Sequence, residues 1–398
     1  MAAIQVEIEK GLARHLKAGH PWVFTRGLAE RPKGLEAGAI VDLVENGHFV
    51  ARGYYDPHSP IVVRVLTRKK DEGVDAGFWG RRVAGALEIR RSFLDLSGTD
   101  CFRMVHGESD FLPGVVVDVY AGWAIVKLYS AGLRTFREDL VAAIRRALGD
   151  ALLGIFGRQG ASEDADESDA GGAALWGPEP PDPVAVVENG VRFLVNVKKG
   201  QKTGFFLDQR ENRLAIRRYA RVERAVNCFS FSGGFSVHAA LAGAKRVVSV
   251  DTDPWALELA RENFRVNDLD PGAHEFVEMP VAEFLAAERV ARRASGLVIL
   301  DPPAFAKSAK TVEPALAGYA SLNRSGAQVV LPGGILATCS CSARISLEQF
   351  FQAVKEGAYK ARVDLALLES RGQPPDHPVL LQFPEGRYLK FLVLQRHA

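Results

Sequence analysis

The second half of the chain alternates short apolar runs with stretches of helical periodicity. The apolar runs cover residues 225–228, 246–251, 297–301 and 334–338. Runs of this length are typical of buried strands, and their alternation with helices predicts a mostly parallel sheet covered by helices on both faces. We therefore expect an α/β domain over residues 191–398.

The first 72 residues follow a different pattern. Runs rich in β-branched and aromatic residues cover positions 39–45, 48–55 and 61–66, and glycine or proline separates them. Short strands punctuated in this way predict a small β-barrel or sheet.

The segment from residue 73 to residue 190 mixes the two patterns. It contains one predicted helix near 78–94, two strands near 114–120 and 123–129, a second helix near 135–148 and a strand near Leu152. This order predicts a compact α+β domain. Residues 160–183 are rich in Gly, Ala, Pro and acidic residues and have no periodicity, so we expect an exposed linker there.

Composition agrees with a folded chain of more than one domain. The protein has 398 residues, of which 47% are hydrophobic and 25% charged, as in ordinary globular proteins. The start has no signal-peptide core, and no apolar run reaches the roughly 18 residues of a membrane span. The four cysteines are too few for a disulfide framework. We expect a cytoplasmic protein with reduced thiols and no membrane partner.

The net charge of +2 does not by itself indicate a nucleic-acid partner. Residues 1–70 carry eleven Lys or Arg against seven Asp or Glu. This mild excess has two interpretations, a solvated surface and a contact for phosphates.

The strongest cofactor signal follows the first apolar run of the second half. The segment 227–236, Asn-Cys-Phe-Ser-Phe-Ser-Gly-Gly-Phe-Ser, stands between a strand and a helix. Glycines permit close backbone approach there, and a helix N-terminus offers unpaired amides. The next strand ends at Asp251, which can accept hydrogen bonds from ribose hydroxyls. A Gly-Gly turn alone is weak evidence, because it also serves as a plain strand-to-helix turn.

Two further strand ends carry candidate chemistry. Asp301-Pro302-Pro303 closes one strand, and Cys339 and Cys341 close another. The carboxyl edge of a parallel sheet is where ligands bind, and in extended backbone both thiols face one side. No further Cys or His clusters with them, so we expect no metal site. Buried, inert thiols are the stronger interpretation from these residues alone.

Together these motifs resemble the RlmI-type large-subunit ribosomal RNA cytosine-5 methyltransferases, which have an N-terminal PUA domain. The matching segments run nearly end to end: 20–24, 51–55, 105–114, 200–210, 301–305, 338–342 and 376–379. The resemblance implies a PUA domain over 1–72, a central α+β domain over 73–190 and a Rossmann-like domain over 191–398 that binds S-adenosylmethionine.

The resemblance also implies roles for individual residues. Cys341, seven residues after Gly334, is similar to the family's nucleophile, with Cys339 as the alternative. Asp301 either removes the proton from carbon 5 of the base or positions the base. The segment 200–210 resembles a lid over the methionine end of the cofactor. The implied cofactor-binding residues are Asn227, Phe229, Ser230, Gly233, Gly234, Asp251, Asp208, Arg210, Asp301 and Pro302.

The sequence departs from the family's pattern at Pro280, where relatives commonly have an acidic residue for the adenine amino group. Glu283 or a backbone carbonyl is the remaining candidate for that contact. The expected partner is large-subunit ribosomal RNA with an unpaired or flipped base, and the oligomeric state stays open, a homodimer included. The implied RNA contacts are Lys10, Arg14, Lys17, Arg26 and Lys202.

Two alternatives remain at this point. A guanine-N or uracil-5 RNA methyltransferase would use the same cofactor, and a guanine-N enzyme would not need Cys341. A non-catalytic RNA-binding assembly factor would retain the PUA domain without the chemistry. Retention of both Asp301 and Cys341 argues against the second alternative.

Overall fold

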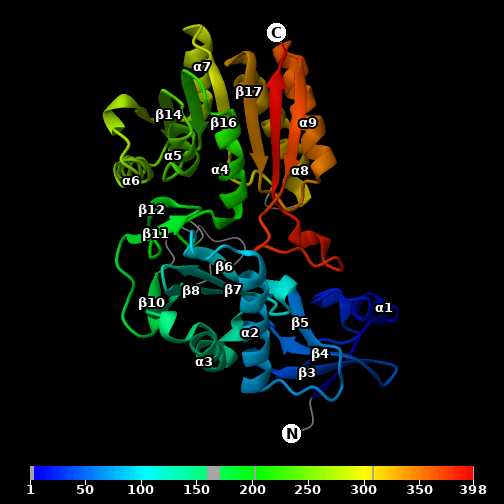
Figure 1. The fold of residues 1–398 in the computed structure, drawn as a ribbon. Coiled ribbons are helices and arrows are strands. Elements are labelled where there is room, and N and C mark those ends of the chain that lie inside the picture. The colour runs from blue at the N-terminus through cyan, green and yellow to red at the C-terminus, as the bar shows by residue number, and fades with distance from the viewer. Residues whose placement is uncertain (1–3, 159–170, 201–202, 307–308, 398) are drawn as a thin grey trace. The chain divides into compact units, whose positions relative to one another are not determined.

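The computed structural model describes residues 4–158, 171–200, 203–306 and 309–397. The chain forms two compact units, each made of segments that are distant in sequence (Figure 1). The first unit contains residues 1–186, 195–207 and 375–386, and the second contains 187–194, 208–374 and 387–398.

The first unit begins with a five-stranded sheet of order β1-β3-β4-β5-β2. Its elements are β1 (Ile4–Glu7), α1 (Leu12–Lys17), β2 (Trp22–Phe24), β3 (Ile40–Glu45), β4 (His48–Tyr55) and β5 (Ile61–Thr67). An antiparallel bridge between Ile8 and Leu28 joins the chain just beyond the two edge strands. The sheet therefore closes on itself as a small barrel, and the three strands predicted in this region are confirmed.

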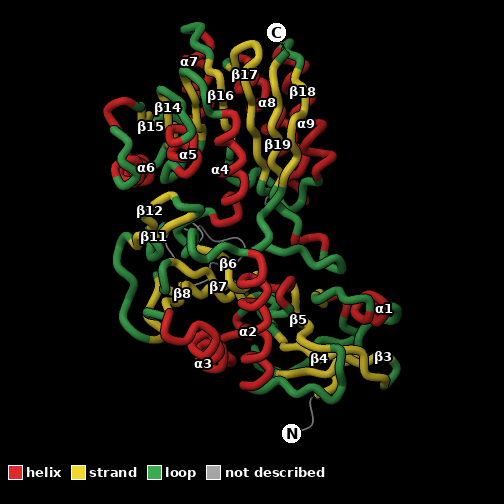
Figure 2. Tube along the Cα trace, viewed as in Figure 1, coloured by secondary structure: helices red, strands yellow, loops and turns green. Residues whose placement is uncertain are grey.

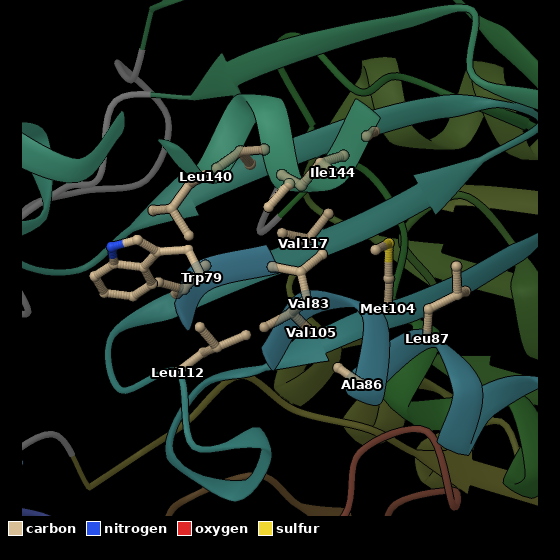
Figure 3. Packing of buried hydrophobic residues seen from close by; sticks show 14 of the residues in the cluster. Trp79, Val83, Ala86, Leu87, Met104, Val105, Leu112, Val117, Leu140 and Ile144 are labelled. Carbon is tan, nitrogen blue, oxygen red and sulfur yellow. The ribbon is translucent and has the colours of Figure 1, made fainter. Parts of the chain in front are cut away.

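A second five-stranded sheet, of order β10-β9-β8-β7-β6, follows in the same unit. Its elements are α2 (Ala76–Phe93), β6 (Cys101–His106), β7 (Val115–Tyr120), β8 (Trp123–Leu128), α3 (Arg137–Leu148), β9 (Gly154–Arg158) and β10 (Gly172–Trp176). Figure 3 shows Trp79 and Val83 of α2 and Leu140 and Ile144 of α3 packed with Val117 of β7. Both helices thus bury their apolar faces against this sheet.

The sequence prediction for this region needs correction. Strand β6 was not predicted, and residues 172–176, expected in a linker, form β10 instead. β10 pairs antiparallel with β9 and has mostly exposed side chains, so its sequence lacks the apolar alternation of a half-buried strand. The rest of the expected linker up to residue 170, with its acidic run, lies outside the described residues. A hairpin of β11 (Val184–Glu188) and β12 (Val191–Val195) comes next.

The second unit is built on a seven-stranded sheet of order β15-β14-β13-β16-β17-β19-β18. Its strands are β13 (Arg224–Cys228), β14 (Arg246–Asp251), β15 (Glu275–Glu278), β16 (Ser295–Leu300), β17 (Val330–Ser340), β18 (Leu365–Arg371) and β19 (Lys390–Arg396). The first five are parallel, and β19 runs antiparallel to both β17 and β18. The mostly parallel sheet and the four predicted strands are therefore confirmed.

Helices cover both faces of this sheet, as predicted (Figure 2). They are α4 (Arg210–Ile216), α5 (Gly234–Leu241), α6 (Pro254–Arg265), α7 (Val281–Val290), α8 (Val312–Gln328) and α9 (Leu347–Ala361). Val226 and Cys228 of β13 belong to the core cluster that includes Tyr319 of α8 and Phe350 of α9. The intervening Asn227 bonds Ser236 of α5. Because successive strand residues face opposite sides, α5 and the α8–α9 pair lie on opposite faces.

The topology brings several chain segments to one edge of the sheet. The parallel strands β13, β14, β16 and β17 all end there. Because β19 is antiparallel to β17, its first residue, Lys390, pairs with Ser340 at the end of β17. Within the part of the chain that is described, no helix is both long and apolar enough to cross a membrane.

Candidate active site

The loop after β13 has an unusual backbone. Phe229, Phe231 and Gly233 have positive φ angles of 60°, 46° and 78°. A positive φ is uncommon in residues other than glycine, and such residues cluster at functional sites. A Cβ on Gly233 would also lie 2.9 Å from the Cβ of Ala260 in α6. Glycine is therefore required here both by the backbone and by the close packing of α5 against α6.

Asp251, at the end of β14, holds this loop in place. Its carboxylate accepts a hydrogen bond from the Phe231 amide at 2.7 Å and another from the Asp253 amide at 3.1 Å. A carboxylate has about four acceptor sites, so Asp251 retains acceptor capacity for hydroxyl groups of a ligand.

Two polar atoms of the loop region are buried without a partner. Asn227 donates through Nδ2 to Ser236 Oγ at 2.9 Å. Its Oδ1 atom and the Ser230 hydroxyl have no hydrogen-bond partner among the described residues. Buried polar atoms are normally satisfied, so these two fit a polar ligand held against the loop. The set, with Asp251, suits a nucleoside cofactor.

Asp301 follows β16 at the same edge, and a neighbouring amide orients it. Gln209 donates from Nε2 to Asp301 Oδ1 at 2.9 Å. The Gln209 carbonyl oxygen in turn accepts from Asn212 Nδ2 at 2.7 Å. Gln209 was not among the predicted site residues, because an uncharged amide between two charged residues gives no distinct signal in a sequence.

Those two charged neighbours, Asp208 and Arg210, are both buried. Asp208 accepts a hydrogen bond from the Tyr388 hydroxyl at 2.8 Å, and Arg210 pairs with Glu211 at 3.3 Å. Neither side chain lies at the surface, and the lid role of this segment stays a prediction. Lys202, predicted in the same segment, lies outside the described residues.

The two thiols at the end of β17 differ in their surroundings. Cys339 is fully buried, and burial, together with the nearby Asp301 carboxylate, raises the pKa of its thiol well above the usual value. Cys341 lies one residue beyond the strand and is only partly buried. Its Sγ donates a long hydrogen bond, 3.9 Å, to the Pro302 carbonyl oxygen.

Lys390 is a further residue of this edge that was not predicted. Its Nζ donates to the carbonyl oxygens of Ser342 at 2.6 Å and Tyr388 at 2.8 Å. Burial lowers the pKa of Lys390 to about 8, and the opposing charge of Cys341 acts to raise it. The sequence did contain one signal for this residue: Lys390 is a single lysine at the start of the apolar run 389–394. A charge in such a run is seldom buried without a partner, so it could have been predicted to have a specific role.

The expected RNA contacts of the first unit lie on its surface. Lys10, Arg14, Lys17 and Arg26, which we call the basic α1 group, are all exposed. Arg14 and Lys17 belong to the last turn of α1, where a positive charge also stabilises the helix dipole. None of the four forms an ion pair with another described residue. The geometry thus suits phosphate contacts but does not require them.

At the adenine position, Pro280 precedes α7 as its N-cap residue, with φ −57°. Glu283 lies exposed in the first turn of that helix. Register places Glu278 opposite Asp251 on the neighbouring strand. The source of the adenine contact therefore stays a prediction.

Comparison with known families gives two matches within the chain. The family described as S-adenosylmethionine-dependent methyltransferase matches residues 103–389, and the PUA-like domain matches residues 6–68. A methyltransferase from Streptococcus mutans has the same fold, with a TM-score of 0.85 at 24% identity over 98% of this chain and 100% of that chain. A methyltransferase solved in complex with SAH gives a TM-score of 0.86, with the same identity and coverage.

Sequence relatives cover almost the whole length. A ribosomal RNA large subunit methyltransferase I from Pseudoalteromonas atlantica is 36% identical over 98% of both chains. The protein of that name from Salmonella newport is 37% identical over 96% of this chain and 95% of its own. The one from Klebsiella pneumoniae is 35% identical over 96% of both. The protein therefore belongs to the S-adenosylmethionine-dependent methyltransferase family that has an N-terminal PUA-like domain and includes the ribosomal RNA large subunit methyltransferases I.

Proposed function

We propose that the protein methylates carbon 5 of a cytosine in large-subunit ribosomal RNA, with Cys341 as the nucleophile. The observation that carries this proposal is a partly buried thiol beside the Asp301-Pro302 turn, at the sheet edge that also holds the cofactor loop. The names of the full-length relatives support ribosomal RNA as the substrate.

Carbon 5 of cytosine is a poor nucleophile, and this explains the need for a thiol. S-adenosylmethionine supplies an activated methyl group bound to a positively charged sulfur. The Cys341 thiolate adds to carbon 6 of the base, which makes carbon 5 electron-rich enough to attack that methyl group. On transfer, the bond between the methyl group and the sulfonium sulfur would break and leave a neutral thioether. The proton on carbon 5 then leaves to a base, and the bond between carbon 6 and Cys341 Sγ breaks to return the thiolate.

Cys341 fits this role better than Cys339. A nucleophilic cysteine needs an accessible thiolate. Cys339 has no exposed surface and a raised pKa, so it suits a structural thiol. Cys341 is partly exposed at the end of the same strand.

Asp301 has two candidate roles in this reaction. It can remove the proton from carbon 5 as a general base, or it can accept the cytosine amino group and hold the ring. The hydrogen bond from Gln209 orients the carboxylate, and the position of Asp301 directly after β16 is compatible with either role.

The RNA substrate must present an extruded base, since the ring has to meet the thiol and the methyl donor together. The basic α1 group is our candidate for gripping the RNA backbone of such a segment. A uracil-5 enzyme would use the same nucleophile, and a guanine-N enzyme would not.

The decisive experiment measures methyl transfer from labelled S-adenosylmethionine to ribosomal RNA that lacks the modification. Wild type is compared with Cys341→Ala and Cys339→Ala, and the product is identified by nucleoside mass spectrometry. We expect 5-methylcytosine from wild type and Cys339→Ala but none from Cys341→Ala. Full activity in both variants would move the target to a ring nitrogen, and 5-methyluridine would identify the uracil alternative.

A further inference from the structure

Lys390 reaches the Cys341 segment through the antiparallel pairing of β17 and β19. It pairs with Ser340, the residue before Cys341, and its Nζ bonds the carbonyl of Ser342, the residue after it. A second bond to the Tyr388 carbonyl fixes the ammonium on its own strand. Lys390 therefore contacts the residues on both sides of Cys341 in the sequence, Ser340 and Ser342.

We propose that Lys390 is a positioning residue that holds Cys341 in place and keeps it as the reactive thiolate. This inference rests on the proposed function, in which Cys341 is the nucleophile. A nearby ammonium stabilises a thiolate electrostatically, and the effect is stronger where water is partly excluded. Lys390 is 4% exposed, so its charge is poorly screened.

The other groups around Lys390 do not replace this charge. Arg387 lowers the pKa of Lys390, whereas the charge of Cys341 raises it. Tyr388 directs its hydroxyl to Asp208. From α8, Tyr319 contacts Ser342 Oγ at 3.1 Å, and burial raises the pKa of Tyr319, so it stays neutral. Among these described groups, Lys390 is the one whose positive charge interacts directly with the charge of Cys341.

The interaction also distinguishes the two thiols. Cys339 lies beside the Asp301 carboxylate, which disfavours a second negative charge. Cys341 instead interacts with an ammonium. The two thiols are only two residues apart, yet a negative charge acts on Cys339 and a positive charge acts on Cys341.

The test is the pH dependence of Cys341 alkylation by iodoacetamide in the folded, full-length protein, followed by peptide mass spectrometry. Wild type is compared with Lys390→Met and Lys390→Arg, and with Lys360→Met as a matched control at an exposed lysine that pairs with Glu356. We expect the midpoint to rise by about one pH unit in Lys390→Met, a tenfold loss of thiolate at neutral pH. Lys390→Arg and Lys360→Met should stay close to wild type.

An unchanged midpoint in Lys390→Met would overturn the proposal. A second criterion needs no variant: the wild-type midpoint must lie below about 8.5, the ordinary value for a free cysteine, and a value at or above it also overturns the proposal. Cys339 in the same digest reports on folding, because it should resist alkylation in every intact variant.

Alkylation uses no RNA, so this result is separate from the methylation assay. If Cys341→Ala kept full methyl transfer, the proposed function would fail while the alkylation midpoints still reported on the Lys390–Cys341 interaction. If Cys341→Ala lost activity and the midpoints did not move, only the role of Lys390 would fail.

Discussion

Charged and polar side chains gather in two regions of this protein under opposite conditions. The basic α1 group is exposed, and its side chains have no fixed partner among the described residues. At the sheet edge, Asp208, Asp301 and Lys390 each have a hydrogen-bond partner that sets their orientation. The first region can meet a long, variable polyanion, whereas the second is arranged for one small reacting group.

This difference between the two regions predicts where single substitutions have large effects on activity and binding. An exposed charge is screened by water and salt, so each contributes little by itself. A buried polar group has been removed from water, so losing its partner costs the full penalty of desolvation. We therefore expect large effects from single changes at the sheet edge and small, additive effects in the basic α1 group.

The largest effect is expected for Asp301→Asn, which keeps the size of the side chain but removes its negative charge. Methyl transfer should slow by about 100- to 10,000-fold if Asp301 is a general base. In that case a covalent protein–RNA adduct should accumulate, because the proton on carbon 5 cannot leave, and a denaturing gel would detect it. Slow transfer without an adduct would instead indicate that Asp301 positions the base, and an unchanged rate would contradict both roles.

A smaller effect is expected at the cofactor loop. Asp251→Ala removes the carboxylate that holds the Phe231 amide and is predicted to bind ribose. Affinity for S-adenosylmethionine, measured by calorimetry, should fall about 10- to 100-fold, the cost of losing a hydrogen bond to a charged group. Asp253→Ala is the matched control, since it removes a side chain that caps α6 through the Trp255 amide and keeps the backbone amide that Asp251 binds. Equal affinity in wild type and Asp251→Ala would refute the assignment.

The burial of Lys390 predicts a specific pH dependence of stability. Its folded pKa of about 8 lies below the ordinary 10.5, so the cost of the buried ammonium is fully present below pH 8. As pH rises from 8 to 10.5, the folded protein releases this proton before the unfolded chain does, and the free energy of unfolding rises. Relative to Lys390→Met, wild type should gain about 3 kcal/mol between pH 7 and 10.5 in urea unfolding. Parallel pH profiles in the two proteins would show that Lys390 ionises normally.

The basic α1 group should act collectively. The affinity for RNA falls with salt, and each phosphate contact contributes about 0.7 to the slope of log affinity against log salt concentration. Replacing all four residues with Gln should therefore reduce this slope by about 3. Anisotropy titrations at several KCl concentrations would measure this slope. A quadruple Gln variant on the second unit is the control, with changes at Arg289, Arg292, Lys355 and Lys360. Equal slopes for both variants would mean that the group makes no specific phosphate contact.

The smallest effect is expected for Arg14→Gln alone. It should change the salt slope by about 0.7 or less and leave methyl transfer at saturating RNA unchanged. A loss of activity as large as that of Asp301→Asn would contradict the proposed difference between the two regions, because it would show that an exposed arginine takes part in the chemistry. The measurement is the transfer rate at two RNA concentrations, one far above the dissociation constant.

Much of the second unit was predictable because its signals are local. Parallel strands buried on both faces are continuous apolar runs, so β13, β14, β16 and β17 were identified, and the family resemblance was confirmed by full-length relatives. The domain boundaries at residues 72 and 190, and the individual site residues, stay predictions. The strands that were not predicted are β1, β2, β6, β10, β11, β12, β15, β18 and β19. β10 is an edge strand with exposed side chains, and nothing in its own sequence distinguishes it from a loop.

The sequence by itself determined which residues end the strands of the α/β sheet: Asp251, Asp301, Cys339 and Cys341 all follow apolar runs. Only the tertiary structure decided how the two thiols differ. Burial and the charge of Asp301 act on Cys339, and Lys390, some fifty residues further along the chain, acts on Cys341 through an antiparallel strand pair. Burial and electrostatics depend on distances in space, and only the folded chain sets these.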